Sequence, residues 1–389
     1  MKEIYLDNSA TTKISREALD KYIEISSEYY GNPSSLHALG FRAEKILSEA
    51  RGEILNSLSA PGASVVFCGS GSEANNLAIL GRAMAKERYK KGARIIITDS
   101  EHASVNECAK KLETDGFKVV KIPTKDGKID TGALSDALTP DTILVSVMMV
   151  NNETGALYDT LTVSKLVRAR AKDAYVHVDA TQSYMKFPFT KAQTGADMIT
   201  LSSHKIEGPK GVGALVIDAR VMKERGLGAV TLGGGQEMGL RSGTENVPAV
   251  AAFAEAVKVG RKNLEKRYEK MRTLRNYLIE KLNTTPALSE ISLTNPEKSA
   301  PHILSITLPK IKSETMLHFL SSKGIYVSSG SACSSNSNHS SSALVAYGRT
   351  AEEADSSVRV SFSHTNDLCD VDALCEALAE GIERLARVR

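Results

Sequence analysis

Short runs of apolar residues recur along the first part of the chain, separated by stretches of helical character. The runs cover residues 64–68, 94–98, 118–122, 142–150, 175–179, 198–202 and 212–218. Most are continuously apolar rather than alternating, as is typical of strands covered on both faces. The helices between them are predicted at residues 71–90, 101–115, 131–138 and 160–172. This alternation predicts an α/β fold with a mostly parallel sheet.

From about Ala249 the pattern changes. Residues 249–283 form one long helical stretch without proline. Further strands are expected near residues 302–308, 324–329 and 358–363, followed by a closing helix over 370–388. We therefore predict a large domain over about residues 15–255. A smaller α/β domain would be built from residues 1–14 and 256–389.

Charge and hydropathy exclude several classes of protein. The chain has 389 residues and a net charge of +3 with both signs interspersed, so neither nucleic acid nor an anionic membrane surface is an expected partner. The start, MKEIYLDNSATT, lacks the apolar core of a signal peptide. The longest apolar stretch is about half of the roughly 20 residues that a membrane span needs. We expect a cytosolic enzyme or binding protein.

The five cysteines are an odd number and contain no Cys-x-x-Cys pair, so neither a disulfide framework nor a metal site is expected. Cys68 lies in an apolar run and Cys108, Cys369 and Cys375 lie in helical stretches, where a structural role is the simplest interpretation. Cys333 differs, because nine of the sixteen residues in the surrounding segment 327–342 are serine.

Polar and reactive side chains follow nearly every predicted strand. The sequences at these strand ends are GSGSE, DSEH, VNNETG, DATQ and SSHK. Ligands of an open parallel sheet bind beyond the carboxyl ends of its strands. The pattern therefore predicts a single active site at that edge.

Two of these strand ends suggest specific chemistry. In GSGSEANN, the turn at Gly71 and Ser72 leads into a helix and could hold a phosphate, although a plain strand–helix turn fits equally well. Lys205 directly follows an apolar strand, together with Ser202 and His204. A lysine removed from water in a cleft loses its proton more easily and can form a Schiff base with a carbonyl.

Asp179 ends another strand, with Gln182 one turn later, and His102 follows a third. Asp179 could cap a helix, and His102 could be a solvated loop residue. Combined with Lys205 and a phosphate cradle, they suggest pyridoxal 5'-phosphate, which needs a lysine for its aldehyde and an acid for its ring nitrogen. His102 would then stack on the ring.

Two further residues could bind anions. Thr244 lies with Arg241 in the glycine-rich loop 233–246, where its hydroxyl could reach a phosphate. Arg359 lies in the apolar strand SSVRVSF, and a buried arginine is rare unless it is paired. It could bind a substrate carboxylate in bidentate fashion or form an internal salt bridge.

Together these residues resemble the cysteine desulfurases of the NifS/IscS kind, within the fold-type I (class V aminotransferase-like) pyridoxal phosphate enzymes. The resemblance covers nearly the whole chain. It is carried by YLDNSATT (5–12), GNPSSLH (31–37), GSGSEANN (69–76), EH (101–102), VNNETG (150–155), HVDATQS (177–183), SSHKIEGPKGVGAL (202–215), RSGTEN (241–246) and SSGSAC (328–333).

The resemblance implies a seven-stranded sheet, a homodimer and a role for each site residue. Lys205 would link to the cofactor and later move the substrate proton, Asp179 would pair with the ring nitrogen, and Arg359 would bind the carboxylate of L-cysteine with help from Asn152. The remaining cofactor contacts would be Gln182 and Asn152 at the ring oxygen, His102 on the ring face, Gly71, Ser72, Ser202 and His204 at the phosphate, and Thr244 at the phosphate of the neighbouring subunit.

Cys333 would be the nucleophile that takes sulfur from L-cysteine as a persulfide and leaves alanine. A serine-rich loop would let it deliver that sulfur to an acceptor protein, such as an iron–sulfur scaffold, or for cofactor or tRNA thiolation. The alternatives are a class V aminotransferase, a selenocysteine lyase, and a weakly active protein that docks sulfur acceptors. Two departures from the family pattern are Ser72, where threonine is usual, and Glu207, where tyrosine or histidine is frequent.

Overall fold

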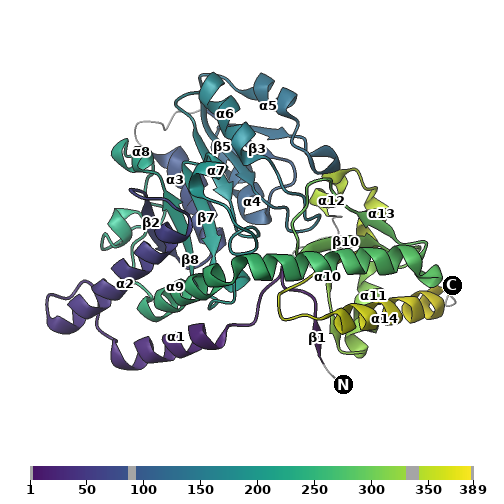
Figure 1. The fold of residues 1–389 in the computed structure, drawn as a ribbon. Coiled ribbons are helices and arrows are strands. Elements are labelled where there is room, and N and C mark those ends of the chain that lie inside the picture. Colours follow the sequence, from purple (N-terminus) through teal and green to yellow (C-terminus); the bar gives the residue numbers. More distant parts are fainter. Residues whose placement is uncertain (1–2, 86–92, 330–340, 387–389) are drawn as a thin grey trace.

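A seven-stranded sheet forms the centre of the larger part of the molecule (Figure 1). The computed structural model describes residues 3–85, 93–329 and 341–386, and the strand order within them is β2-β8-β7-β6-β5-β3-β4. The strands are β2 (Ser64–Cys68), β3 (Arg94–Thr98), β4 (Lys118–Ile122), β5 (Thr142–Met148), β6 (Tyr175–Asp179), β7 (Met198–Ser202) and β8 (Gly213–Ile217). Strand β8 runs antiparallel to both its neighbours, and the other pairs are parallel. The predicted mostly parallel α/β sheet is confirmed.

Helices cover both faces of this sheet. One face packs against α1 (Arg16–Glu28), α2 (Ala38–Ser57), α5 (Thr131–Ala137), α6 (Thr160–Arg170) and α9 (Val247–Lys262). The other packs against α3 (Gly71–Met84), α4 (Ala103–Thr114) and α8 (Ala219–Lys223). Neighbouring strand residues such as Val66 and Phe67 belong to opposite cores. Both faces of the strands are buried, which explains their continuously apolar sequences.

The C-terminal part has a second sheet and its own apolar core. Among the described residues this sheet has the order β12 (Ser328–Ser329), β13 (Ser357–Ser361), β10 (Ile303–Thr307) and β9 (Ser292–Thr294), all antiparallel. The helices around it are α10 (Leu264–Thr284), α11 (Ser313–Ser322), α12 (Ser342–Tyr347), α13 (Ala351–Asp355) and α14 (Leu368–Ala386). This separate core supports the proposed domain division, whose boundaries stay a prediction.

The N-terminal segment joins the two parts. Strand β1 (Ile4–Tyr5) pairs in parallel with β11 (Ile325–Tyr326) beside the second sheet. A few residues later, Thr12 N donates a hydrogen bond to the carbonyl of His204 at 2.9 Å, at the end of the large sheet. The segment therefore crosses from one sheet to the other.

Several elements differ from the sequence prediction. The helix expected over residues 71–90 ends at Met84, and the strand expected near residues 324–329 is two short strands, β11 and β12, in different sheets. The single helix expected over residues 249–283 is two helices, because Asn263 leaves the helical conformation (φ −116°, ψ 12°) between α9 and α10. The strand expected over residues 142–150 ends at Met148, and Val150 instead forms an isolated bridge with Leu157.

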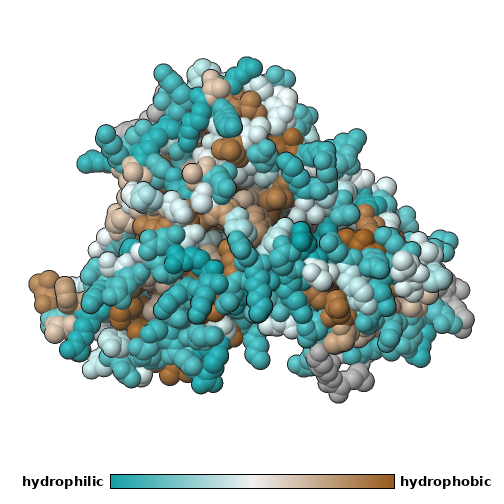
Figure 2. Space-filling model, viewed as in Figure 1, coloured by the Kyte–Doolittle hydropathy of each residue, from teal (hydrophilic) through white to brown (hydrophobic). Residues whose placement is uncertain are grey.

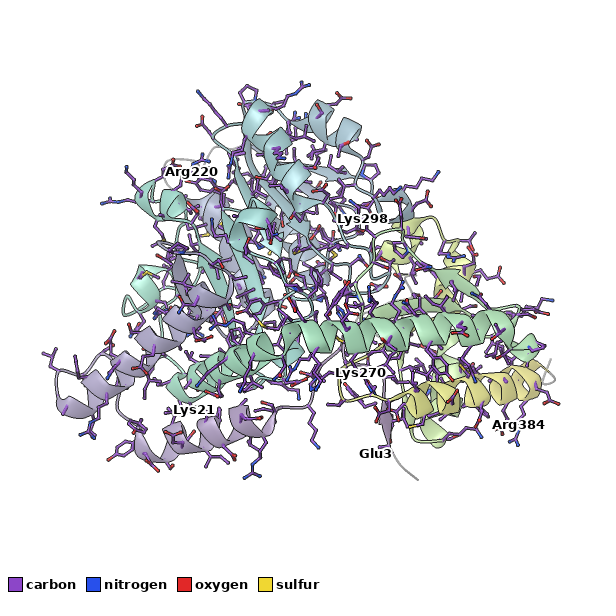
Figure 3. The ribbon with its side chains drawn as sticks, in the orientation of Figure 1. Glu3, Lys21, Arg220, Lys270, Lys298 and Arg384 are labelled. Carbon is purple, nitrogen blue, oxygen red and sulfur yellow. The ribbon has the colours of Figure 1, made fainter. Side chains whose placement is uncertain are left out.

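The visible surface is largely polar. Charged side chains project from it, and among the labelled ones Arg384 lies at the outer end of α14 (Figure 3). An apolar patch lies at the tip where the loop after α1 enters α2 (Figure 2), and the exposed Leu36 of this loop and Phe41 of the first turn of α2 belong to this region. Across the residues that the structure describes, no helix combines the length and apolarity needed to cross a membrane.

Candidate active site

A cavity of about 350 Å³ lies where the carboxyl ends of the parallel strands meet the second sheet. Three groups of residues line it. The large sheet and its loops contribute Ser70, Gly71, Ser72, Asn75, His102, Ser104, Met148, Val150, Asn152, Glu153, Asp179, Thr181, Gln182, Ser202, His204 and Lys205. The N-terminal segment contributes Asp7, Ser9 and Ala10, and the second sheet contributes Ser328, Ser329 and Arg359. The strand ends therefore meet at one site, as the sequence predicts.

Lys205 is held by the N-terminal segment. It ends the short 3₁₀ helix Ser203–Lys205 after β7, and its Nζ donates hydrogen bonds to the backbone carbonyls of Ser9 and, at 2.9 Å, Ala10. Burial, with the charges of Lys205 and Lys210, lowers the pKa of His204 to about 4. His204 is therefore neutral at physiological pH beside the lysine.

Asp179 is fixed at the end of β6 by two donors. Its Oδ2 accepts from Asn75 Nδ2 at 2.8 Å and its Oδ1 accepts from the backbone N–H of Thr181 at 2.9 Å. Asn75 Nδ2 also donates to Ser104 Oγ at 2.9 Å, and Ser104 Oγ lies 2.9 Å from Nδ1 of His102. Asn75 and Ser104 therefore connect the carboxylate to the imidazole.

His102 caps α4 and faces the same cavity. Its burial lowers the pKa of the imidazole, while Asp179 acts in the opposite direction and Lys205 adds to the lowering. The ring is therefore uncharged near neutral pH, which suits stacking on an aromatic ligand.

The turn between β2 and α3 is shaped for a group that approaches the backbone closely. Ser70 caps α3 by accepting from the backbone N–H of Glu73 at 3.1 Å. A Cβ atom at Gly71 would lie 3.1 Å from the Cβ of Ser202 and 3.2 Å from Oγ1 of Thr181. Glycine therefore leaves space at the positive end of a 14-residue helix, where backbone N–H groups bind anions.

Arg359 projects from β13 and is held on two sides. Its Nη1 donates to the carbonyl of Asn152 at 2.9 Å, and its Nη2 lies 2.9 Å from Oδ1 of Asp7. The arginine is 6% exposed. Of the two sequence interpretations, the internal salt bridge is therefore present, and the same arginine also lines the cavity.

One sequence-predicted site residue, Thr244, does not line the cavity of this chain, and another cannot be placed. Thr244 is exposed on the loop before α9, and Arg241 on that loop pairs with Glu73 at 2.8 Å. Cys333 lies outside the described residues. The nearest described residues on either side are Ser329, which lines the cavity, and Ser341, whose hydroxyl donates to Glu153.

The sequence profile described as "Aminotransferase class-V" matches residues 4–374. The chain belongs to the class V aminotransferase family. The chain is 37% identical over 382 residues to "Cysteine desulfurase IscS 1" of Archaeoglobus fulgidus, and the match covers 98% of this chain and 97% of the relative. The predicted family is thereby confirmed.

Solved structures of this family superimpose on nearly the whole chain. One named "NIFS-LIKE PROTEIN" matches with a TM-score of 0.90 and 32% identity, covering 98% of this chain and 100% of that one. Another, "SspA in complex with cysteine", matches with a TM-score of 0.79 and 29% identity, covering 93% and 99%. The fold-type I architecture is confirmed by these neighbours.

The sequence patterns do not single out several polar residues of the cavity, among them Asp7, Asn75, Ser104 and Glu153. Each lies within or close to a quoted motif, but contacts with distant parts of the chain, such as that of Asp7 with Arg359 and that of Asn75 with Asp179, place it at the cavity. Burial raises the pKa of Glu153 to about 7, and its Ser341 hydrogen bond and Arg359 oppose that rise.

Proposed function

We propose that the protein is a pyridoxal phosphate-dependent cysteine desulfurase. It would convert L-cysteine to L-alanine and keep the sulfur as a persulfide on Cys333. The observation that carries this proposal is the gathering of Lys205, Asp179, His102 and Arg359 around one cavity. The relative named cysteine desulfurase and the neighbour in complex with cysteine support it.

The residues of the cavity fit pyridoxal phosphate. Gly71 leaves the space that a Cβ atom would fill, and the Oε1 of Gln182 is buried without a partner among the described residues. Lys205 would hold the aldehyde carbon, Asp179 the ring nitrogen and His102 the ring face. The phosphate would be held by Gly71, Ser72, Ser202 and His204, and the ring oxygen by Gln182 and Asn152.

When bound, the cofactor supplies an electron sink for the substrate. The protein's own residues would do the rest. Arg359 holds the substrate carboxylate, and Lys205 Nζ moves the proton at the substrate Cα. The Cys333 thiolate attacks the substrate sulfur: a new S–S bond forms, the C–S bond breaks, and its electron pair goes to the substrate Cβ, which takes up a proton to give alanine.

The proposal extends to a homodimer and a sulfur acceptor. Thr244 is exposed outside this chain's own cavity, which is the arrangement expected if it reaches the phosphate of a neighbouring subunit. Leu36 and Phe41 form an exposed apolar tip that a second copy could cover. The persulfide would then pass to an acceptor protein such as an iron–sulfur scaffold.

The test is alanine and sulfide production from L-cysteine by the purified, cofactor-loaded protein. We expect stoichiometric alanine and sulfide in the presence of a reductant. Cys333→Ser should keep the cofactor absorbance and lose sulfur release, because it removes only the nucleophile. Lys205→Ala should lose the absorbance that depends on the lysine link.

Different failures point to different alternatives. A cofactor-loaded wild-type protein that yields neither alanine nor sulfide would contradict the desulfurase proposal. Full sulfur release by Cys333→Ser would remove the nucleophile role alone, and an unchanged absorbance in Lys205→Ala would remove the role of the lysine.

A further inference from the structure

Arg359 is already paired with a carboxylate of the protein itself. Asp7 Oδ1 lies 2.9 Å from Nη2 of Arg359, and the two side chains are 19% and 8% exposed. Both line the cavity. An amino acid whose carboxylate binds there therefore meets an arginine that has a fixed orientation and a neighbouring negative charge.

The backbone fixes Asp7 to the strand that carries the arginine. Asp7 forms a parallel bridge with Ser361, two positions beyond Arg359 on β13. The N–H of Ser361 donates to the carbonyl of Leu6 at 2.7 Å, and the N–H of Asn8 donates to the carbonyl of Ser361 at 3.2 Å. Asp7 and Arg359 therefore stay in register even though 352 positions separate them in sequence.

Asn152 holds the other end of the guanidinium, which fixes its plane. Nη1 donates to the Asn152 carbonyl at 2.9 Å, and Nε is buried without a partner among the described residues. An arginine without these contacts has many rotamers to lose when it binds a ligand, whereas a planar guanidinium that is already oriented loses fewer. The remaining N–H groups of the Arg359 guanidinium therefore have a fixed orientation.

We propose that Asp7 is a positioning residue for substrate recognition, which holds the guanidinium of Arg359 in the orientation that receives the carboxylate of the substrate. The inference rests on the proposed function. Asp7 acts through Arg359 and takes no part in breaking the C–S bond.

The test compares L-cysteine with L-cysteinamide, in which a neutral amide replaces the carboxylate. For Asp7→Ala we expect the KM for L-cysteine to rise about tenfold, with kcat within about threefold of wild type, because the lost orientation weakens binding more than chemistry. The KM for L-cysteinamide should not change. Asp7→Asn, which keeps an oxygen that accepts from Arg359, should recover part of the loss. Where turnover of L-cysteinamide is too slow to measure, its dissociation constant, obtained from the change in cofactor absorbance on binding, is compared in place of KM.

Asn8→Ala is the matched control. Asn8 lies in the same segment, and its Nδ2 donates to the carbonyl of Ser361 at 3.0 Å without contacting Arg359. Any effect of this variant on attachment of the segment should fall equally on both substrates. If Asp7→Ala does not fold, the same comparison is made with Asp7→Asn, for which a smaller but still selective rise is expected.

An unchanged KM for L-cysteine, or equal rises for both substrates, would overturn the role of Asp7 while wild-type alanine production still supported the desulfurase. Absence of alanine production by the wild type would overturn both proposals together.

Discussion

At the scale of single residues, Glu101, next to His102, has the most strongly shifted pKa of the carboxyl groups near the cavity. We assign it no role in the chemistry. Its Oε1 accepts from Thr98 Oγ1 at 2.5 Å and from the backbone N–H of Met148 at 2.9 Å, while Oε2 has no partner in the described part of the chain. Burial raises the pKa of Glu101 to about 8, those two hydrogen bonds oppose the rise, and Asp179 and Asp99 add to it. The folded protein therefore retains a proton that the unfolded chain releases.

This proton predicts a pH dependence of stability. Between the unfolded pKa of about 4.3 and the folded pKa, the native state binds more protons than the unfolded state, so the free energy of unfolding falls as pH rises. One such group contributes a slope of at most about 1.4 kcal/mol per pH unit. In Glu101→Gln the amide stays neutral, so we expect a flatter profile between about pH 5 and pH 8. Urea unfolding at several pH values measures it.

Glu107→Gln is the control, because Glu107 lies exposed on the neighbouring helix α4. It should leave the wild-type pH profile unchanged. A Glu101→Gln profile as steep as that of the wild type would show that Glu101 is ionised in the folded protein.

The expectation that site residues lie at the carboxyl ends of the strands predicts those residues whose position is set by the nearest strand. Asp179 and Lys205 follow buried strands, and both line the cavity. Asp7 does not emerge from such a rule, because its partner Arg359 is 352 positions away and the contact exists only after the two sheets assemble. Asn75 is missed for a related reason: its partner Asp179 is 104 positions away.

At the scale of elements, the sequence pattern predicts that an element exists, and whether it is a helix or a strand, better than it predicts where the element ends or which way a strand runs. The strands at residues 94–98 and 175–179 match their predicted bounds. The break at Asn263 is not visible in the apolar pattern, because that residue sits in a continuous helical sequence. Nor does the pattern reveal that β8 runs antiparallel, since buried strands of either direction are continuously apolar.

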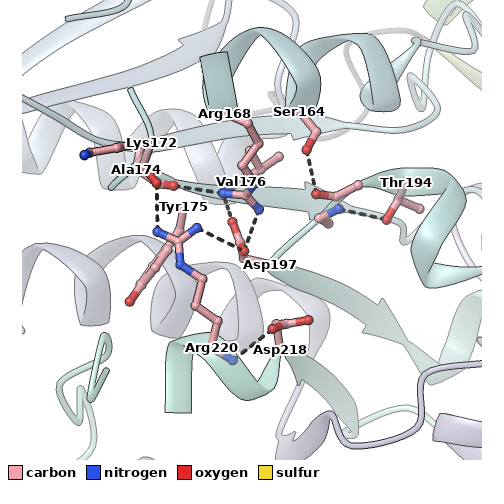
Figure 4. Close-up of polar contacts among 12 residues, drawn as sticks. Ser164, Arg168, Lys172, Ala174, Tyr175, Val176, Thr194, Asp197, Asp218 and Arg220 are labelled. Atoms are coloured by element: carbon pink, nitrogen blue, oxygen red, sulfur yellow. Dashed lines mark hydrogen bonds and ion pairs between the residues drawn. The ribbon is translucent and has the colours of Figure 1, made fainter. Parts of the chain in front are cut away.

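At the end of the sheet opposite the cavity, Asp197 holds the amino end of β7 through several polar contacts (Figure 4). Its carboxylate accepts from the backbone N–H of Val176 at 2.8 Å and from Arg168 at 2.6 Å, and Arg220 lies 4.0 Å away. Asp197→Ala leaves a buried N–H and a guanidinium without their acceptor, so we expect a loss of about 3 kcal/mol in the free energy of unfolding. Chemical denaturation measures this loss.

Asp20→Ala is the matched control, because Asp20 pairs with Arg16 on α1 and both side chains are exposed. It should cause no measurable loss. The cofactor absorbance of Asp197→Ala should stay that of the wild type, since the site lies at the other edge. Equal stability of the two variants would show that the Asp197 contacts contribute little.

At the scale of the whole molecule, polar contacts join the lysine loop to the second part of the structure. Glu207, two residues after Lys205, pairs with Arg267 of α10 at 3.3 Å and with Nδ1 of His364 beyond β13 at 3.1 Å. Its backbone adopts a left-handed conformation (φ 68°) that favours glycine, so local preference does not explain the residue. The sequence shows Glu207 only as a departure from the family pattern, because its partners lie far along the chain.

Removal of the Glu207 charge should loosen this connection in a pH-dependent way. Burial alone would raise the pKa of Glu207, but His364 and Arg267 more than offset it, and the net pKa is lowered. Its contribution is therefore present above the unfolded pKa of about 4.3 and is lost as pH falls through the lower folded value. For Glu207→Gln we expect a loss of roughly 1–3 kcal/mol at pH 7, since one partner of a partly buried pair is removed. The difference from wild type should shrink toward zero below about pH 4.

Glu297→Gln is the control, because its pair with Lys128 also joins the two parts but both side chains are exposed. Urea unfolding of the three proteins at pH 7 and at about pH 3 measures both effects. Equal losses in both variants at pH 7 would contradict a specific role for Glu207 in holding the lysine loop against α10.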